Sequence, residues 1–457
     1  MTKQINYPSS LHFEVDADGL SETKNITVAN TGSERVTIES LDSDNPNFTN
    51  NLSVEILQPE FPPNSEIFFG PNRTIQNPST GEYYTTDLNL GKIGNTDSNK
   101  ELHIEIVIPQ PIEVYGTYEI VGENIGSSTN PVYAVGKYEN KVYVGARMQQ
   151  IEVYDYDTGI SSTPYPTWNW DAHRNDFEVN EYGVYYTGNG YGQHNANRRL
   201  VRMVEGMDPQ ILSSTNLTSS INCIDKLGTT FLFYGGAFGL RRFNIDTLDD
   251  RARTAPGFQI NCLCSLQWSL IYGGVTVWNA DTDALRVYNG DTNSWSSINS
   301  KLTSHSSSRL IRSMVHDGDE NLYVGGRFTA VNGISGTGGI ARYHIPTNTW
   351  HSVGGGVSNT IDPEVNSMVF DDYGRLFVGG RFNFAGGVDH TYNLAMFSAG
   401  NWYPVGRGCG SGTQFVGKLL FCNESKHLYI GGSFTAVNQE NGTTLSVRRF
   451  ARFVRTE

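Results

Sequence analysis

The sequence predicts an all-β protein built largely from one repeated unit. Residues 321–357, NLYVGGRFTAVNGISGTGGIARYHIPTNTWHSVGGGV, show this unit most clearly. Short apolar runs of period two, punctuated by Gly and Asn, are typical of short antiparallel strands. The glycine pair indicates a place where a side chain would collide with a neighbouring backbone, or where φ is positive. Helical and leucine-rich repeats are excluded because no copy has the apolar spacing of a helix.

The unit recurs along the chain. Residues 376–408 and 428–438 are close copies, residues 231–246 and 269–295 are weaker copies, and the stretch between 141 and 190 holds the faintest. The first glycines of the seven copies are Gly145, Gly188, Gly235, Gly273, Gly325, Gly379 and Gly431. Their successive spacings are 43, 47, 38, 52, 54 and 52 residues. Periods of this length are typical of repeat architectures and propellers.

The order of residues inside the unit identifies the kind of repeat. An apolar strand is followed by Gly-Gly, a Phe or Tyr, a turn and a Trp, and this order resembles the kelch blade. The fuller pattern resembles the kelch-related propellers of bacterial and fungal surface proteins, most clearly over 321–440 and most faintly over 131–215. The resemblance implies a seven-bladed kelch-like β-propeller over residues 111–457, with four strands in each blade.

The chain also predicts how such a ring closes. The last copy ends at 449–453 on its third strand, with no fourth strand after it. The fourth-strand pattern WYPVG (402–406) recurs upstream as YEIVG (118–122). We therefore expect a strand near 115–123 to complete the seventh blade, which removes an unpaired sheet edge.

The blade aromatics are expected to pack between the sheets rather than to form a site. They are Tyr323, Phe328, Tyr343 and Trp350 in one copy, and Phe377, Phe382, Phe397 and Trp402 in the next.

Residues 1–110 form a separate unit, joined through the stiff linker Pro109–Pro111. Residues 11–49 alternate apolar and polar side chains around the turn Asn30–Ser33, which predicts a hairpin. Further strands are expected within 62–72 and 101–111, while 73–99 is expected to be a surface loop or a contact loop. The unit resembles the immunoglobulin-like sandwich of the ASPM–SPD-2–Hydin and choice-of-anchor group. The matching residues are Phe13, Gly19, Asn30–Gly32, Phe48, Pro62, Pro63, Phe68 and Pro71.

Composition restricts the partners. The net charge of −14 disfavours nucleic acid and anionic membrane surfaces as partners. No window approaches the ~18 apolar residues of a membrane helix, and the N-terminus lacks the pattern of an export signal. The five cysteines have no disulfide or zinc spacing, so we expect free and mostly buried thiols.

The sequence contains no catalytic motif. The histidines are scattered and none lies in a HExxH, GxSxG or P-loop context. The acidic runs 279–283 and 317–320 could hold Ca²⁺, but they lack the EF-hand glycine and glutamate and are expected to be turns. We therefore expect no catalytic residues, no metal and no cofactor.

Two sets of residues are candidates for binding. The first lies where the repeat is most diverged, so that aromatic and polar side chains are free to stack on sugars, unless these copies have simply drifted. This set is Trp168, Trp170, His173, Tyr186, Tyr191 and His194. The second lies on the first strand of four copies, nearest the expected axis, where the residues either pack the channel or bind a ligand. This set is Asn222, Cys223, Asn261, Cys262, Arg312, Ser313, Asn366 and Ser367.

These observations favour a non-enzymatic structural and binding protein. The main hypothesis is a virion component, such as a phage or large-virus tail, fibre or capsid-decoration protein that is assembled in the cytosol and then exposed. Its sandwich would attach to other structural proteins, and its propeller would bind a host-surface glycan or receptor. The alternatives are a kelch-like adaptor, cytoplasmic or at the cell surface, and a carbohydrate-active propeller enzyme.

Overall fold

The computed structural model divides the chain into two compact units, residues 1–113 and 114–457. In the first unit the structure describes the backbone of the strands named below. In the second it describes residues 116–455 except 122–129, 147–150, 165–169, 172–176, 191–198, 206, 208–209, 213–220, 254–256, 268–269, 307 and 361, and only the backbone of 170–171, 177, 186–190, 199 and 455. Within these residues the regular structure is entirely β, as expected. The described part has no helix that could cross a membrane.

The first unit contains one four-stranded sheet and two antiparallel pairs. Its strands are β1 (Ile5–Asn6), β2 (Thr23–Asn30), β3 (Val54–Ile56), β4 (Glu66–Phe68), β5 (Arg73–Gln76), β6 (Tyr83–Thr86), β7 (Lys92–Gly94) and β8 (Leu102–Val107). The sheet has the order β1-β2-β8-β3, and the pairs are β4–β7 and β5–β6. The expected strands in 62–72 and 101–111 correspond to β4 and β8. The residues expected to complete the hairpin after Ser33 lie outside the described residues.

Residues 73–99 differ from the expected loop. The segments RTIQ and YYTT pair as β5 and β6, with Arg73 opposite Thr86, and β7 pairs with β4. Thr, Ile and Tyr are residues that favour extended strands, and the sequence NPSTGE between the two segments is rich in residues that favour turns. The expectation of a plain loop was therefore wrong for these residues.

The second unit contains seven successive sets of antiparallel strands, numbered here in chain order. Set 1 is β10 (Val132–Tyr138), β11 (Lys141–Ala146), β12 (Ile151–Asp155) and β13 (Ser161–Ser162); set 2 is β14 (Trp170–Asp171), β15 (Phe177–Asn180), β16 (Gly183–Gly190), β17 (Arg199–Met203) and β18 (Gln210–Ile211); set 3 is β19 (Ile221–Leu227), β20 (Phe231–Gly236), β21 (Gly239–Asn244) and β22 (Asp249–Ala252); set 4 is β23 (Ile260–Gln267), β24 (Leu270–Val277), β25 (Asp283–Asn289) and β26 (Ser294–Thr303).

The last three sets carry additional short strands. Set 5 is β27 (Arg309–His316), β28 (Asn321–Arg327), β30 (Ile340–His344) and β31 (Thr349–Ser352), with β29 (Ala330–Val331); set 6 is β33 (Glu364–Phe370), β34 (Leu376–Arg381), β36 (Leu394–Ser398) and β37 (Asn401–Pro404), with β32 (Val357–Ser358) and β35 (Phe384–Ala385); set 7 is β38 (Val416–Cys422), β39 (His427–Gly432), β42 (Phe450–Arg455) and β9 (Gly116–Glu119), with β40 (Ala436–Asn438) and β41 (Thr444–Ser446).

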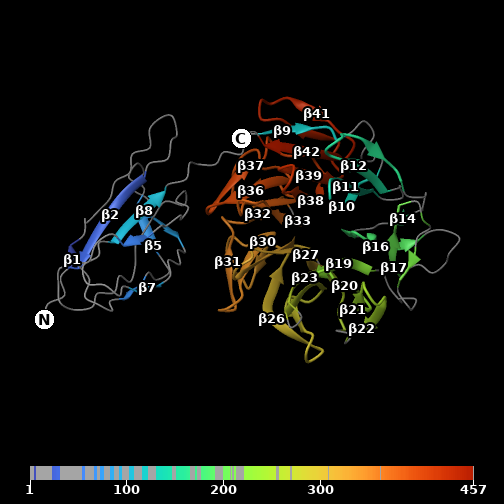
Figure 1. The fold of residues 1–457 in the computed structure, drawn as a ribbon, viewed down its shortest axis with the longest axis horizontal. Helices are drawn as coiled ribbons and strands as arrows, with labels where there is room; N and C mark the ends of the chain where they lie inside the picture. The colour runs from blue at the N-terminus through green and yellow to red at the C-terminus, as the bar shows by residue number, and fades with distance from the viewer. Residues whose placement is uncertain are drawn as a thin grey trace. The chain divides into compact units, whose positions relative to one another are not determined.

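One strand of each set, called here its first strand (β15 in set 2, where the short β14 precedes it), contacts the first strand of the next set. These contacts join β10, β15, β19, β23, β27, β33 and β38 in chain order, and β38 also contacts β10. Figure 1 shows β10, β19, β23, β27, β33 and β38 around a common centre, with β22, β26, β31 and β37 farther out. Hydrogen bonds link sets 4, 5 and 6 into one extended sheet, through Thr276–Leu310 and Arg327–Glu364.

The glycine pair has a packing role at the junction between sets. A Cβ on Gly325 would lie 2.6 Å from Val365 Cγ1 of the next set, and one on Gly431 would lie 2.5 Å from Val132 Cγ1. The second glycine meets backbone instead, since a Cβ on Gly326 would overlap the Leu310 carbonyl. The expected collision with a neighbouring backbone therefore holds for the second glycine, whereas the first glycine is opposed by a side chain of the next set. The contact between Gly431 and Val132 joins the last set to the first.

The blade aromatics form repeated pairs. Tyr343 faces Trp350 with ring centroids 5.0 Å apart, and Phe397 faces Trp402 at 5.1 Å. Trp402 Nε1 donates a hydrogen bond to the Val353 carbonyl of the preceding set at 3.1 Å. Of the eight aromatics expected in the core, six are buried, and Tyr323 and Phe397 are partly buried against the same cluster.

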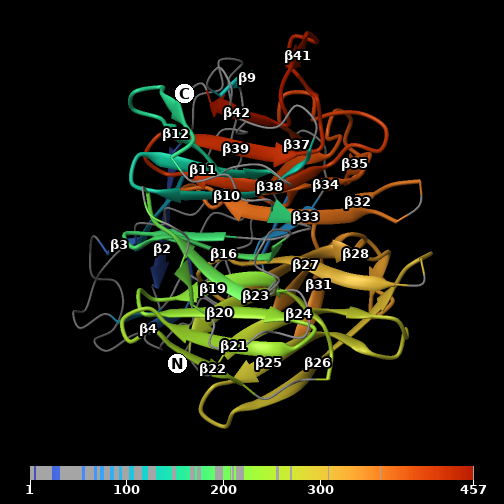
Figure 2. The same cartoon turned by 90° about the vertical axis from the view of Figure 1, so that its right-hand side faces the viewer.

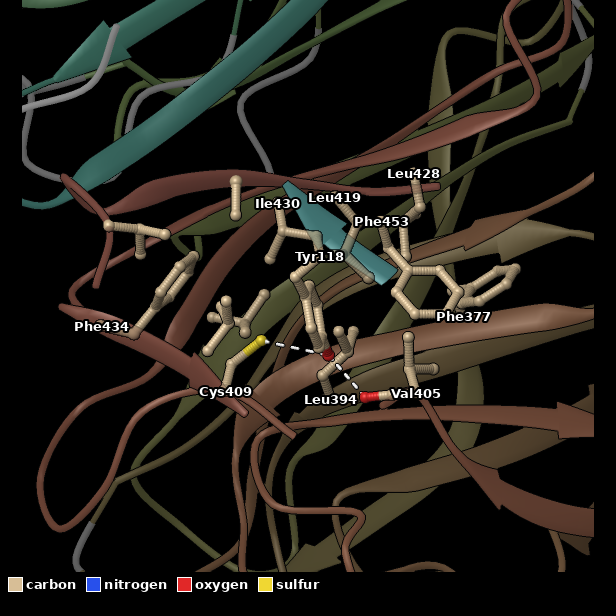
Figure 3. Close-up of a cluster of buried hydrophobic side chains, with 14 of the residues drawn as sticks. Tyr118, Phe377, Leu394, Val405, Cys409, Leu419, Leu428, Ile430, Phe434 and Phe453 are labelled. Atoms are coloured by element: carbon tan, nitrogen blue, oxygen red, sulfur yellow. Dashed lines mark hydrogen bonds between the residues drawn. The ribbon is translucent and has the colours of Figure 1, made fainter. Parts of the chain in front are cut away.

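The N-terminal strand of this unit completes set 7. β9 pairs antiparallel with β42, with Tyr118 opposite Phe453 and Glu119 opposite Arg452; Figure 2 shows the two strands side by side. The strand pairing expected near 115–123 is therefore present over residues 116–119. Tyr118 takes the place of the repeat tryptophan, because its hydroxyl donates to the Val405 carbonyl at 2.5 Å (Figure 3).

Candidate functional site

A cavity of about 510 Å³ lies where the first strands meet. Its lining comes from β10, β15, β19, β23, β27, β33 and β38, together with Arg327 and Arg381 at the ends of β28 and β34. The volume is within the range of small-molecule sites in proteins. Four cationic and three anionic side chains line it: Arg312, Arg327, Arg381 and Lys418, and Glu178, Asp225 and Glu364.

The backbone explains why polar side chains reach this cavity. Six of the first strands pair with their neighbours through a register shift that leaves one extra residue. A β-bulge of this kind interrupts the ladder and re-aims a side chain. The extra residues are Tyr133, Asn222, Asn261, Arg312, Asn366 and Gly417, and all six line the cavity. The strand β15 pairs with β16 in continuous register and contributes Glu178.

Two bulge residues form hydrogen bonds from one set to the next. Asn222 Nδ2 donates to the Ile260 carbonyl at 2.8 Å, and Asn366 Nδ2 donates to the Val416 carbonyl at 2.9 Å. These are equivalent bonds between sets 3 and 4 and between sets 6 and 7. In set 7 the position is Gly417, where a Cβ would lie 2.9 Å from the Val132 carbonyl oxygen. The amide groups therefore have a structural function as well as a place on the cavity wall.

The charged side of the cavity is organised around Glu364. This residue lies opposite Arg327 of β28 in one pairing and opposite Arg381 of β34 in the other. The bulge residue Arg312 donates from Nε to Glu364 Oε1, and Arg381 Nη2 donates to Oε2 at 3.2 Å. Burial alone would raise the pKa of Glu364, but Arg312, Arg381 and Arg327 outweigh it and hold that pKa below its ordinary value. Glu364 therefore remains a carboxylate at neutral pH.

The cysteines in and beside the cavity wall are poor nucleophiles. Burial raises the pKa of Cys262 well above that of a free thiol, and the same cause raises the pKa of its neighbour Cys264 to about 12. The Cys223 thiol donates to the Gly235 carbonyl. A thiol with a raised pKa is a poor nucleophile. All five cysteines are free, and four are buried.

The structure brings together all eight first-strand residues expected near the axis, since each lines the cavity. The other candidate set is not assembled in this way. Trp168, His173, Tyr191 and His194 lie outside the described residues. Of Trp170 and Tyr186 only the backbone is described, in β14 and β16 of set 2, which pair with each other.

The acidic runs act as turns. Asp317 Oδ1 accepts hydrogen bonds from the backbone of Asp319 and Asn321, at 2.9 and 3.1 Å, and Asn279 Oδ1 accepts one from Asp281. Among the described residues no group of three or more His, Cys, Asp or Glu side chains could hold a metal ion.

Sequence reasoning missed several wall residues. Arg327 and Arg381 follow the glycine pair directly, and the segment VGGRF that contains each of them is identical in two consecutive copies. That identity was the available signal, because strand packing does not require an arginine there. Glu364, Lys418, Tyr133 and Phe415 carry no comparable signal.

Comparison with known proteins gives a likeness of fold. No family model matches the chain, and no curated protein matches it. Among solved structures, the extracellular domain of a hybrid two component system from B. thetaiotaomicron is similar, with a TM-score of 0.50 and 12% identity over 74% of this chain. At that identity the likeness concerns the fold alone. The chain spans 40% of the length of that neighbour.

Two further structures are similar at lower scores. The extracellular domain of a one component system from B. thetaiotaomicron has a TM-score of 0.49 and 11% identity, over 74% of this chain and 40% of its own. The computationally designed Ika8 protein has a TM-score of 0.45 and 13% identity, over 74% of this chain and 100% of its own.

Proposed function

We propose that residues 114–457 form a seven-bladed, kelch-related β-propeller and that the protein is a non-enzymatic binding protein. Three features support the propeller: seven antiparallel strand sets, first-strand contacts that return from β38 to β10, and the junction of Gly431 with Val132. On this proposal the cavity lies on the propeller axis, and the strand β9 is the outer strand of the seventh blade.

The observation that carries the binding function is the cavity wall itself. Bulges in five of the seven sets contribute the polar side chains of Tyr133, Asn222, Asn261, Arg312 and Asn366 to one space, and charged residues beside them complete the wall. Arg312 and Arg381 donate hydrogen bonds to Glu364 and hold its pKa below the ordinary value. A general acid or base needs a pKa near the working pH, and a nucleophile needs activation. Recognition of a ligand fits this wall better than catalysis.

We place this binding protein on a virion, as a tail, fibre or capsid-decoration component. The first unit, an immunoglobulin-like sandwich on this proposal, attaches to the particle through its sheet edges. The propeller then binds a host-surface glycan or receptor. Sheet edges accept a strand from a partner, whereas a closed propeller offers its loops and its axial cavity.

The test is incorporation and attachment. We expect the full chain in purified particles, and we expect a chain that lacks residues 1–108 to fold but to be absent from them. Isolated protein should bind glycans on an array without turning them over. Incorporation of the shortened chain would overturn the assigned roles of the two units, and release of sugar products would favour an enzyme.

A further inference from the structure

The cavity wall near Glu364 has more cationic donors than its own carboxylate can satisfy. The guanidinium groups of Arg312, Arg327 and Arg381 surround this single carboxylate, in a chain whose net charge is −14. The strand register fixes the arrangement, because Glu364 is the cross-strand neighbour of both Arg327 and Arg381. The cluster is therefore a built feature of β27, β28, β33 and β34.

The hydrogen bonds show which N–H donors of the three arginines are not used within the protein. Both oxygens of Glu364 are occupied, one by Arg312 and one by Arg381. Arg327 Nη2 donates to Ser308 Oγ. Among the described residues, the buried Nε atoms of Arg327 and Arg381 have no hydrogen-bond partner. A guanidinium carries five N–H donors, and a buried donor without a partner is costly, so an added acceptor would stabilise this side of the cavity.

One side chain of this cationic cluster is partly open to solvent. The Arg381 side chain is 39% exposed, whereas the side chains of Arg312 and Glu364 are 13% and 10% exposed. Tyr133 and Phe415 line the same cavity with stacked rings 6.0 Å apart. The wall therefore combines an accessible cationic group, donors in a planar fork and aromatic surface.

We infer that this cavity binds an oxyanion carried by a small sugar, through Arg327 and Arg381 with Arg312 in support. Carboxylate and sulfate both match the fork of a guanidinium, which binds such groups in a bidentate way. The inference rests on the proposed binding function and adds to it the chemical class of the ligand, an acidic saccharide.

The experiment is calorimetric titration of the full chain at constant ionic strength. The probes are glucuronate and glucose 6-sulfate, with glucose as the uncharged match. We expect the two anions to bind at least about tenfold more tightly than glucose, which is the scale of one hydrogen bond to a charged group. Preference for glucuronate assigns the site to a carboxylate, and preference for the sulfate assigns it to a sulfated sugar. Equal binding of all three sugars, or no binding of either anion, would overturn the inference.

Three variants distinguish anion binding at this site from a general effect of positive charge and from loss of folding. Arg381→Gln should weaken anion binding at least about tenfold. Arg407→Gln, which removes an arginine outside the cavity, should leave binding unchanged. Arg381→Lys retains the charge without the fork and should give an intermediate loss. Equal losses in Arg381→Gln and Arg407→Gln would count against the site.

One variant should strengthen anion binding instead of weakening it. Glu364→Gln removes the internal anion that competes for the three arginines, so anion binding should tighten several-fold in the protein that remains folded. Damage to the fold cannot produce such a gain, and a loss would contradict the inference. Attachment of particles to host cells is measured separately. If the protein binds anions but virions with Arg381→Gln attach normally, the result contradicts the proposed host-binding role and leaves the anion site supported.

Discussion

Two equivalent joints of the second unit are made by different residues. In set 6, Trp402 packs on Phe397 and donates to the carbonyl of Val353 in the preceding set. In set 7, Tyr118 packs on Phe453 at 5.2 Å and donates to the carbonyl of Val405. The first joint lies within one continuous stretch of chain, whereas the second joins residues 287 positions apart.

The second joint has additional clamps. Gln439 accepts from the Tyr118 backbone N–H at 2.9 Å and donates to its carbonyl at 2.8 Å, and Arg452 forms an ion pair with Glu119. Trp402 reaches its place through the short turn between β36 and β37, which keeps the strand close. The β9 strand arrives from the other end of the unit without such a tether. The comparison teaches that one packing geometry can be supplied by local sequence or by a remote strand, and that the remote strand is held by more side-chain bonds.

The largest effect is expected from removing the remote strand. A chain that begins at residue 114 retains β9 and should melt cooperatively. A chain that begins at residue 123 leaves the Tyr118 site empty and the edge of β42 unpaired, which should cost at least about 4 kcal/mol of unfolding free energy. Urea titration of both chains measures this difference. Equal midpoints would show that β9 does not hold the unit together.

Truncation of either aromatic should have the next largest effect. Tyr118→Ala and Trp402→Ala each leave a large cavity, and each should lower the unfolding free energy by about 3–5 kcal/mol. The two rings are 2% and 5% exposed, so similar losses are expected. Denaturant titration compares them directly. A much smaller loss for Tyr118→Ala would mean that the two joints are not equivalent.

The glycines that face these rings provide a closer comparison. A Cβ on Gly406 would lie 2.5 Å from Tyr118 Cε2, and one on Gly354 would lie 2.8 Å from Trp402 Cδ1. Both glycines have positive φ, at 53° and 52°. Gly406→Ala and Gly354→Ala should therefore each cost about 1–3 kcal/mol, measured by thermal unfolding. Unchanged melting of either variant would contradict the close approach at that joint.

The smallest effect is expected from the Tyr118 hydroxyl, which ionises at high pH, whereas the Trp402 ring does not. Tyr118→Phe removes the hydroxyl, which donates to the Val405 carbonyl and accepts from the Cys409 thiol, and should cost about 1 kcal/mol at neutral pH. Burial, followed by the Cys409 neighbour, raises the pKa of Tyr118 above its ordinary value. Above about pH 10 the unfolded tyrosine releases its proton while the folded one keeps it, so stability falls as pH rises. The stability of Tyr118→Phe should fall less steeply there than that of the unmodified chain, whereas Trp402→Phe should leave the slope unchanged.

The sequence by itself determined the local features of this protein. Alternating apolar residues fixed the strands, and the glycine pairs marked the junctions, because both depend on nearest neighbours and backbone sterics. The match of YEIVG to WYPVG identified the strand that pairs with β42, since Tyr118 and Trp402 precede the same Val-Gly pair. In the first unit the same reasoning predicted β4 and β8 but missed β1, β3 and β5 to β7, which are strands of two to four residues.

Only the tertiary structure decided the charged side of the cavity. The sequence placed Asn222, Arg312 and Asn366 on strands near the axis, but the bulges that turn them to one space depend on the pairing partner rather than on the strand's own residues. Glu364 acquired its role because two different pairings place it between Arg327 and Arg381, far apart in the chain. The charges around Glu364 come from strands of more than one set, so they lie close together only after those strands have packed.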